Sequence, residues 1–247
     1  MGLAGAAFAA GAINAVAGGG SLVSFPALIA AGYTPKVANV TNTVALWPGY
    51  FAGSVGYRSE LSVQRQRVKA LVLPSVLGAV AGSAILLSTP AKAFETIVPF
   101  LILFASALMA FQDQIAAFMR SRGHNPGPGA ERSPLLAGST FVLAVYGAYF
   151  GAGLGILLMA ALGILLPDEA QRSNALKGIL SMIMNAVAVV YFAAFGPVEW
   201  LPAGVMAVGA TAGGFLGVGV ARRLGKRWLR VAVVVYGVAA AVVIFLK

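Results

Sequence analysis

Four stretches of the chain run for 18 or more residues with almost no charge, and they limit what it can fold into. They cover residues 37–57, 70–91, 178–198 and 200–221. A helix needs about 20 apolar residues to cross the roughly 30 Å hydrocarbon core of a bilayer. Only 10% of the 247 residues are charged, whereas soluble domains carry about 25%. The sequence therefore predicts an all-α polytopic membrane protein.

Three consecutive glycines interrupt the first apolar segment. Residues 3–17 would form about 22 Å of helix at 1.5 Å per residue, which is too short to cross the bilayer. Gly18, Gly19 and Gly20 follow, and residues 21–31 then form a second short piece. Non-helical backbone at membrane depth is tolerated only against protein or a water-filled cavity. We therefore expect a hairpin of two half-length helices that enters the membrane and turns back.

The second half of the chain repeats this plan. Residues 135–150 and 156–166 are short and apolar, and Gly151, Gly153 and Gly155 lie between them. One gap-free shift of 135 residues superimposes several residues of the two halves. The superimposed pairs are Gly18 with Gly153, Gly20 with Gly155, Asn39 with Asn174, Gly78 with Gly213, and Gly82 with Gly217. Such a constant offset indicates an internal repeat.

We divide the chain on this basis into two membrane repeats of residues 1–119 and 135–247, joined by a cytoplasmic linker of residues 120–134. Each repeat is predicted to contain a broken-helix hairpin followed by three transmembrane helices. The predicted helices cover residues 37–57, 70–88 and 94–118 in the first repeat, and residues 173–195, 200–221 and 229–246 in the second.

The charges of the loops predict how the two repeats are oriented. Residues 58–69 are basic, whereas the equivalent loop near residue 199 is not; the turn at Lys92 is nearly neutral, whereas its equivalent at residues 222–230 is basic. Because positive loops face the cytoplasm, equivalent loops lie on opposite sides and the repeats are inverted. We expect a cell-membrane protein, in the inner membrane of a bacterium, with both termini extracytoplasmic. Of the 17 Lys and Arg residues, only Lys36, Lys92 and Lys247 would then lie outside.

The composition excludes several other classes of function. Cysteine is absent, so no disulfide framework or thiolate site is available. The net charge of +10 is what cytoplasmic loops require, and no basic stripe carries stacking aromatics, so we expect no nucleic-acid partner. No base accompanies Ser21 in the membrane segments, so the chain is not predicted to be an enzyme. We expect no catalytic residue, no metal site and no cofactor.

The breaks in the two hairpins are candidate anion sites. Each second half-helix begins with backbone N–H groups that have no helical partner and with the positive end of the helix dipole. Glycine lets an anion approach this backbone, and Ser21 can cap the helix or donate to a ligand. The candidate residues are Gly18, Gly19, Gly20, Ser21, Gly151, Gly153 and Gly155. The alternative reading of these glycines is close helix packing.

Polar side chains on the helices that follow the hairpins are further candidates. They are Asn39, Asn42 and Thr43 in the first repeat and Asn174, Lys177 and Asn185 in the second. Amides and hydroxyls can donate to an oxyanion without burying a charge. Hydrogen bonding between helices is their alternative role. Lys177 either balances the charge of an anion or extends to the cytoplasmic surface.

Two stretches resemble a known family. Residues 17–28 (Ala-Gly-Gly-Gly-Ser-Leu-Val-Ser-Phe-Pro-Ala-Leu) and 38–46 (Ala-Asn-Val-Thr-Asn-Thr-Val-Ala-Leu) resemble the TauE/SafE family, described as sulfite and organosulfonate exporters. Residues 173–178, with Asn185 downstream, are similar to the second repeat of that family. The resemblance implies transport of a small anion (sulfite, a sulfonate or a carboxylate) across the lipid bilayer, coupled to a proton or driven by the anion's own gradient. A passive channel or carboxylate permease is the alternative, and a homo-oligomer remains an open possibility.

Overall fold

The fold is a bundle of helices in which two hairpins enter from opposite ends. The computed structural model describes residues 2–16, 18–55, 64–121, 133–166, 168–224 and 226–246. The helices are α1 (Gly2–Val16), α2 (Ser21–Ala30), α3 (Pro35–Val55), α5 (Arg65–Ser88), α6 (Ala91–Ala110), α7 (Gln112–Ser121), α8 (Pro134–Tyr149), α9 (Leu154–Leu165), α10 (Ala170–Phe195), α11 (Trp200–Leu224) and α12 (Lys226–Phe245). The prediction of an all-α polytopic membrane protein is confirmed.

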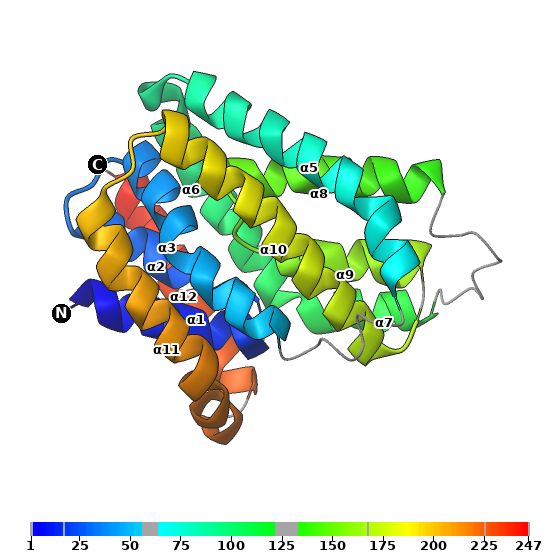
Figure 1. Cartoon of the computed structure of the whole chain (residues 1–247). Coiled ribbons are helices and arrows are strands. Elements are labelled where there is room, and N and C mark those ends of the chain that lie inside the picture. The colour runs from blue at the N-terminus through cyan, green and yellow to red at the C-terminus, as the bar shows by residue number, and fades with distance from the viewer. Residues whose placement is uncertain are drawn as a thin grey trace.

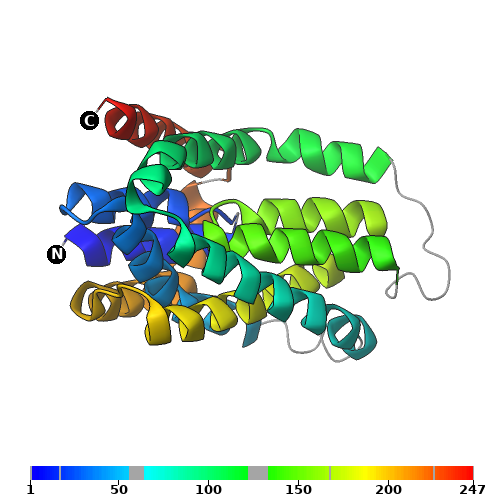
Figure 2. The same ribbon diagram turned by 90° about the horizontal axis from the view of Figure 1, so that it is seen from above.

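Both predicted hairpins are present. Helices α1 and α2 enter from the end at which the N and C termini lie, and α8 and α9 enter from the other end (Figures 1 and 2). Figure 2 shows the tips of the two hairpins meeting near the middle of the bundle. Each half-helix is short because the chain has to turn back before it crosses the bundle. The break at Ala17, and the linker residues 122–132, lie outside the described residues.

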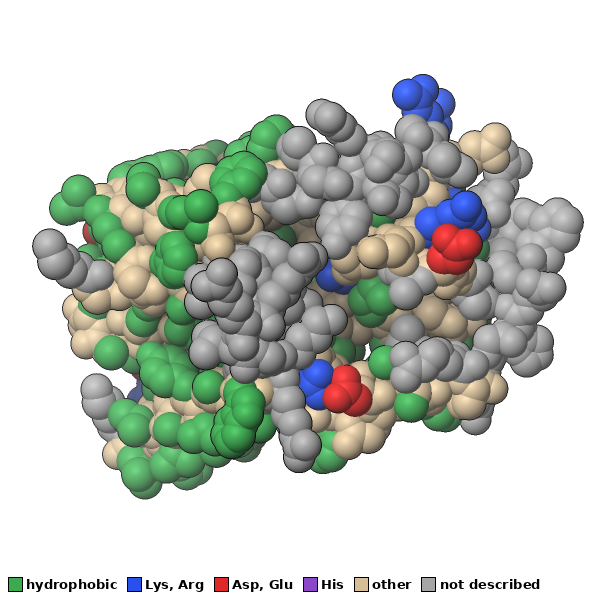
Figure 3. Space-filling model, turned by 90° about the horizontal axis from the view of Figure 1, so that it is seen from below, with side chains coloured by type: hydrophobic (Ala, Val, Ile, Leu, Met, Phe, Trp, Pro, Cys, Tyr) green, Lys and Arg blue, Asp and Glu red, His purple; other side chains and the backbone are tan. Residues whose placement is uncertain are grey.

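The described helices carry the apolar length and surface of membrane segments. Within the described residues, α5, α6 and residues Gln171–Phe195 of α10 are long and apolar enough to cross a bilayer. Shorter apolar stretches are Gly2–Asn14, Ser21–Ala30, Pro134–Tyr149, Leu154–Leu165, Trp200–Leu216 and Arg230–Phe245. Large apolar side chains are exposed on their outer faces, including Leu73, Val190 and Val208. Apolar side chains cover much of one part of the face in Figure 3, and charged side chains lie next to one another in another part. Such exposed apolar surface is suited to contact with the hydrocarbon of a bilayer.

One predicted span is wrong. The sequence predicts a single helix over residues 94–118, but α6 ends at Ala110 and the separate helix α7 begins at Gln112. Gln112, Asp113 and Gln114 follow directly on the apolar residues of α6. Polar side chains are costly in hydrocarbon, so the apolar span ends where they begin. Asp113 is instead bonded to Arg230 at the start of α12, with distances of 2.6 and 3.0 Å.

The helix bounds repeat at the offset found in the sequence. Adding 135 to the bounds of α6 gives the bounds of α12, and the same shift carries α5 to within one residue of α11. The most extensive helix pairings are α1 with α11 and α5 with α8, and the shift exchanges these two pairs. The indole N–H of Trp47 also approaches the carbonyl of its own counterpart, Met182, at 3.4 Å. Residues 47 and 182 therefore lie where the two halves meet.

Glycines allow the closest of these pairings. A Cβ placed on Gly82 of α5 would lie 2.2 Å from the carbonyl oxygen of Val145 in α8, and one on Gly213 of α11 would lie 2.0 Å from that of Phe8 in α1. No side chain fits at such distances. Small residues thus bring the backbones of the long helices against the hairpin helices, as in other membrane bundles.

This close contact predicts the effect of adding one methyl group. Gly82→Ala should push α5 away from α8 and destabilise the protein by about 1–3 kcal/mol, the usual cost of overpacking. Gly138→Ala in α8 is the matched control, because nothing lies within 4 Å of its added Cβ. Thermal unfolding of the purified protein in detergent measures both. Equal midpoints for the two variants would contradict the packing role of Gly82.

Candidate functional site

A cavity lies where the two hairpin tips meet. Its volume is about 80 Å³, several times the 10–15 Å³ that one water needs. Five helices and both breaks contribute to its wall. The lining residues are Asn14, Gly18, Gly19, Ser21, Gly49, Tyr50, Gly151, Leu154, Gly155, Asn174, Lys177, Gly178 and Ser181. Seven of the thirteen predicted candidates are among them.

The first break turns the chain by left-handed backbone. Gly18 has φ +75° and Gly19 has φ +86°, a region that residues with a Cβ rarely occupy. The amide of Gly20 then donates to the side-chain oxygen of Asn14 at 2.6 Å. This bond satisfies one of the N–H groups at the start of α2. The asparagine of α1 therefore caps α2 across the break.

The second break also combines left-handed glycines with a side-chain hydrogen bond to the backbone. Gly151 and Gly153 both have φ +78°, and the hydroxyl of Tyr146 donates to the carbonyl of Ala152 at 2.5 Å. Gly155 lies in the first turn of α9, where the amides of its neighbours Leu154 and Ile156 donate to the carbonyls of Gly151 and Gly153. A Cβ on Gly155 would be 3.7 Å from Cδ of Lys177. The start of α9 and the stem of this lysine are therefore neighbours.

Lys177 lies in the cavity wall. Its ammonium donates to the side-chain oxygen of Asn174 at 2.6 Å, one turn earlier in α10. Its side chain lines the cavity together with Gly155 and Gly178. The sequence left two roles open for Lys177, and the structure does not show the one in which its side chain extends to the surface. The cavity contains one cationic side chain among its lining residues.

A neutral polar cluster forms another part of the wall. The side chains of Tyr50 in α3, Ser21 and Asn14 line the cavity together, and Asn14 also accepts a hydrogen bond from the Gly20 amide. Tyr50 is absent from the sequence candidates. The spacing on α3 is the sequence feature that could have identified it. Tyr50 lies two turns after the candidate Thr43 and so shares a helix face with it.

Six predicted candidates do not line the cavity but support it. Asn39 donates to the carbonyl of Tyr149 at 2.9 Å, and Thr43 donates to the carbonyl of Asn39. Asn185 donates to the carbonyl of Ser181 at 2.8 Å. Asn42 is buried, and its side-chain oxygen has no partner among the described residues. Gly20 packs on Ala10, and Gly153 packs on α6.

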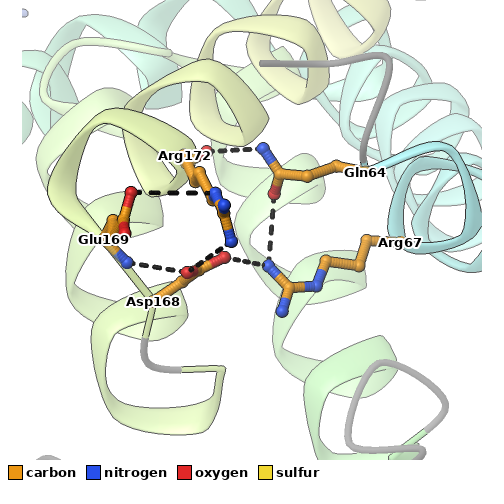
Figure 4. A network of polar contacts seen from close by, with 5 residues as sticks. All are labelled: Gln64, Arg67, Asp168, Glu169 and Arg172. Carbon is orange, nitrogen blue, oxygen red and sulfur yellow. Dashed lines mark hydrogen bonds and ion pairs between the residues drawn. The ribbon is translucent and has the colours of Figure 1, made fainter.

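A charged network joins α5 to the connection between α9 and α10 (Figure 4). Asp168 is ion-paired with Arg67, and Gln64 donates to the carbonyl of Arg172 at 3.0 Å. Arg172 also lies 3.7 Å from Asp168 and 3.8 Å from Glu169. Burial raises the pKa of Asp168, but bonds from Arg67 and the Glu169 amide, with the charges of Arg67 and Arg172, hold it below its usual value. The network ties the first half of the chain to the second.

Comparison with known proteins identifies the family. The family profile described as sulfite exporter TauE/SafE matches residues 3–244. The chain belongs to this family. No solved structure matches the chain.

Curated relatives of the TauE/SafE chain are named as transporters. It is 27% identical to a "Probable membrane transporter protein" of Haemophilus influenzae, over 92% of this chain and 87% of the relative. It is 25% identical to "Probable membrane transporter protein ORF9" of Sinorhizobium sp, over 96% and 88% of the two chains. It is also 25% identical to "Probable membrane transporter protein YfcA" of Escherichia coli K12, over 93% and 83%. The protein is thus a membrane transporter and not an enzyme.

The network at Asp168 predicts a pH-dependent stability. A carboxyl group whose pKa is lowered on folding stabilises the native state above its unfolded pKa, and this contribution is lost as pH falls through the folded pKa. Asp168→Asn should therefore lower the unfolding midpoint at neutral pH, and its difference from the unchanged protein should shrink in acid. Thermal unfolding in detergent across the acid range checks this.

Glu169→Gln is the matched control for this prediction. Its carboxylate is 74% exposed and lies 3.8 Å from Arg172, and exposed pairs contribute about 0–1 kcal/mol. A loss of stability as large as that of Asp168→Asn would mean that the net charge of the loop matters and the Arg67 contact does not.

Proposed function

We propose that this TauE/SafE member is a secondary transporter of small oxyanions, with sulfite or organosulfonates as its substrates. The observation that carries the proposal is the joining of both hairpin tips and Lys177 in one cavity. Sulfite appears in the description of the family, which supports this substrate class. In the proposal the anion binds between the tips and is released to either side of the membrane.

The donors of the cavity fit an oxyanion. Lys177 supplies a positive charge, and the first turn of α9 supplies the backbone N–H of Gly155 and the positive end of a helix dipole. Ser21 and Tyr50 supply hydroxyls from the other hairpin and α3. Because charge-assisted hydrogen bonds are about twice as strong as neutral ones, Lys177 would be the strongest single contact. The remaining predicted candidates would hold the tips in position.

Alternating access would follow from the relation between the halves. We propose that the two repeats are inverted in the membrane, with residues 120–134 as the cytoplasmic linker and the hairpin tips near the midplane. The exchange of the pairs α1–α11 and α5–α8 under the 135-residue shift supports this. In inverted-repeat transporters one half rocks against the other around a fixed site. The same scheme has the protein in the cell membrane of a bacterium with both termini outside.

A passive anion pathway is the second candidate function. The observation that favours it is the lack of a carboxylate among the residues that line the cavity, since embedded carboxylates commonly relay protons in coupled transporters. Counterflow separates the two candidates. Substrate preloaded into vesicles accelerates exchange through a carrier and has no such effect on a pore.

The proposal predicts that removal of one charge weakens anion binding. Lys177→Met keeps the length of the side chain but loses its ammonium group, and hydrogen bonds to charged groups contribute about 1.5–3 kcal/mol. We expect sulfite or methanesulfonate to bind the variant about 10- to 100-fold more weakly. Ligand-induced thermal stabilisation of the purified protein measures this, because a ligand that binds only the folded state stabilises it.

Lys92→Met is the control, because this lysine is exposed at the start of α6. It removes the same charge away from the cavity and should leave binding unchanged. Normal stabilisation of Lys177→Met by these anions would place their site elsewhere and refute the proposed function.

A further inference from the structure

The cavity has an unusually simple set of ionisable groups. Lys177 and Tyr50 are the only ionisable side chains among the lining residues; the others are glycines, amides, serines and Leu154. No described carboxylate or histidine is part of this wall. A lysine held as an ammonium ion gives the empty cavity a charge of +1.

The helices packed around Lys177 add no carboxylate beside it. On α10 itself, Arg172 is ion-paired with Asp168 and Glu169 more than one turn before Lys177. From α8, the Tyr146 hydroxyl is bonded to the Ala152 carbonyl, and the ring of Tyr149 packs on Phe94.

The other neighbours of α10 present only cations and tyrosines. Helix α9 has no ionisable residue. On α5, Arg67 pairs with Asp168, and the other charged residues are Arg65 and Lys69 near its start. On α3, Lys36 donates to the carbonyls of Leu87 and Thr89, and Tyr50 lines the cavity.

This charge balance distinguishes between anions of different valence. A singly charged anion beside Lys177 makes the cavity neutral. A doubly charged anion leaves one uncompensated negative charge inside a bundle surrounded by hydrocarbon. An unpaired charge away from water is costly, and paired charges far less so. The cavity therefore suits an anion of charge −1.

We infer that the site selects singly charged anions, and that a proton moved with sulfite travels on the anion itself and not on a protein side chain. This inference deepens the proposed function and rests on it. Sulfite, SO3²⁻, is the conjugate base of a weak acid, and its singly charged form is hydrogen sulfite, HSO3⁻. When this ion is released into a less acidic solution it gives SO3²⁻ and H⁺, so one proton crosses for each ion carried. Coupling to protons then needs no embedded carboxylate.

The first test compares two ligands of the same shape. Methanesulfonate has charge −1 at all working pH values, whereas methylphosphonate changes from −1 to −2 at its second ionisation. We expect the purified protein to bind methylphosphonate at least about tenfold more weakly, relative to methanesulfonate, above this ionisation than below it. Taking the ratio cancels any pH effect that acts equally on the binding of both ligands.

The second test follows protons in proteoliposomes. A pH-sensitive dye inside the vesicles reports proton movement, potassium with valinomycin clamps the voltage, and protein-free vesicles correct for direct permeation of sulfur dioxide. We expect about one proton for each sulfite transported, because HSO3⁻ is the carried form. Methanesulfonate should cross without moving protons.

The outcomes separate the inference from the proposed function. A constant ratio of the two affinities overturns the charge selectivity, and protons that accompany methanesulfonate show that a protein group carries them. Either result leaves anion transport standing. If neither anion binds nor crosses, the proposed function fails and the inference fails with it.

Discussion

The structure depends on one constraint: a backbone broken inside an apolar bundle must find hydrogen-bond partners within the protein. Each unpaired N–H or C=O group in hydrocarbon costs several kcal/mol. The first break meets this need through Asn14, which caps α2, and the second through Tyr146, which bonds the Ala152 carbonyl. Both breaks then face one cavity, so the remaining polar groups lie against each other and not against lipid. Neither hairpin would be stable alone.

The long helices make this arrangement possible. Glycines on α5 and α11 let backbones approach the hairpin helices α8 and α1 at distances that exclude a Cβ. Each hairpin is thus packed against a long helix from the opposite half. The Asn39 side chain strengthens the same coupling, because it reaches from α3 to the Tyr149 carbonyl at the second tip. The two halves are therefore joined by packing and by a direct hydrogen bond at the second tip.

The sequence predicts the parts of this structure that local chemistry determines. Apolar length and glycine breaks identify both hairpins, and one constant offset identifies the repeat. It does not predict the end of α6 at Ala110, because Phe111 continues the apolar pattern and only the next residues are polar. Tyr50 is missed for another reason. Asn42 and Tyr50 both lie on α3, and only the packing of α3 against α1 and α2 decides that the tyrosine lines the cavity.

The two halves carry different residues at some positions that the 135-residue shift superimposes, and these differences give the cavity its chemistry. The 135-residue shift places Asn42 on Lys177 and Asn39 on Asn174. In the second half the pair bond to each other in the cavity wall, whereas in the first half Asn39 bonds to the opposite tip and Asn42 is buried behind it. Because Asn39 and Asn42 do not line the cavity of about 80 Å³, Lys177 is the one cation among its lining residues. The repeat thus provides two similar sites, and their divergence leaves one cation, which sets the charge of the anion that balances it.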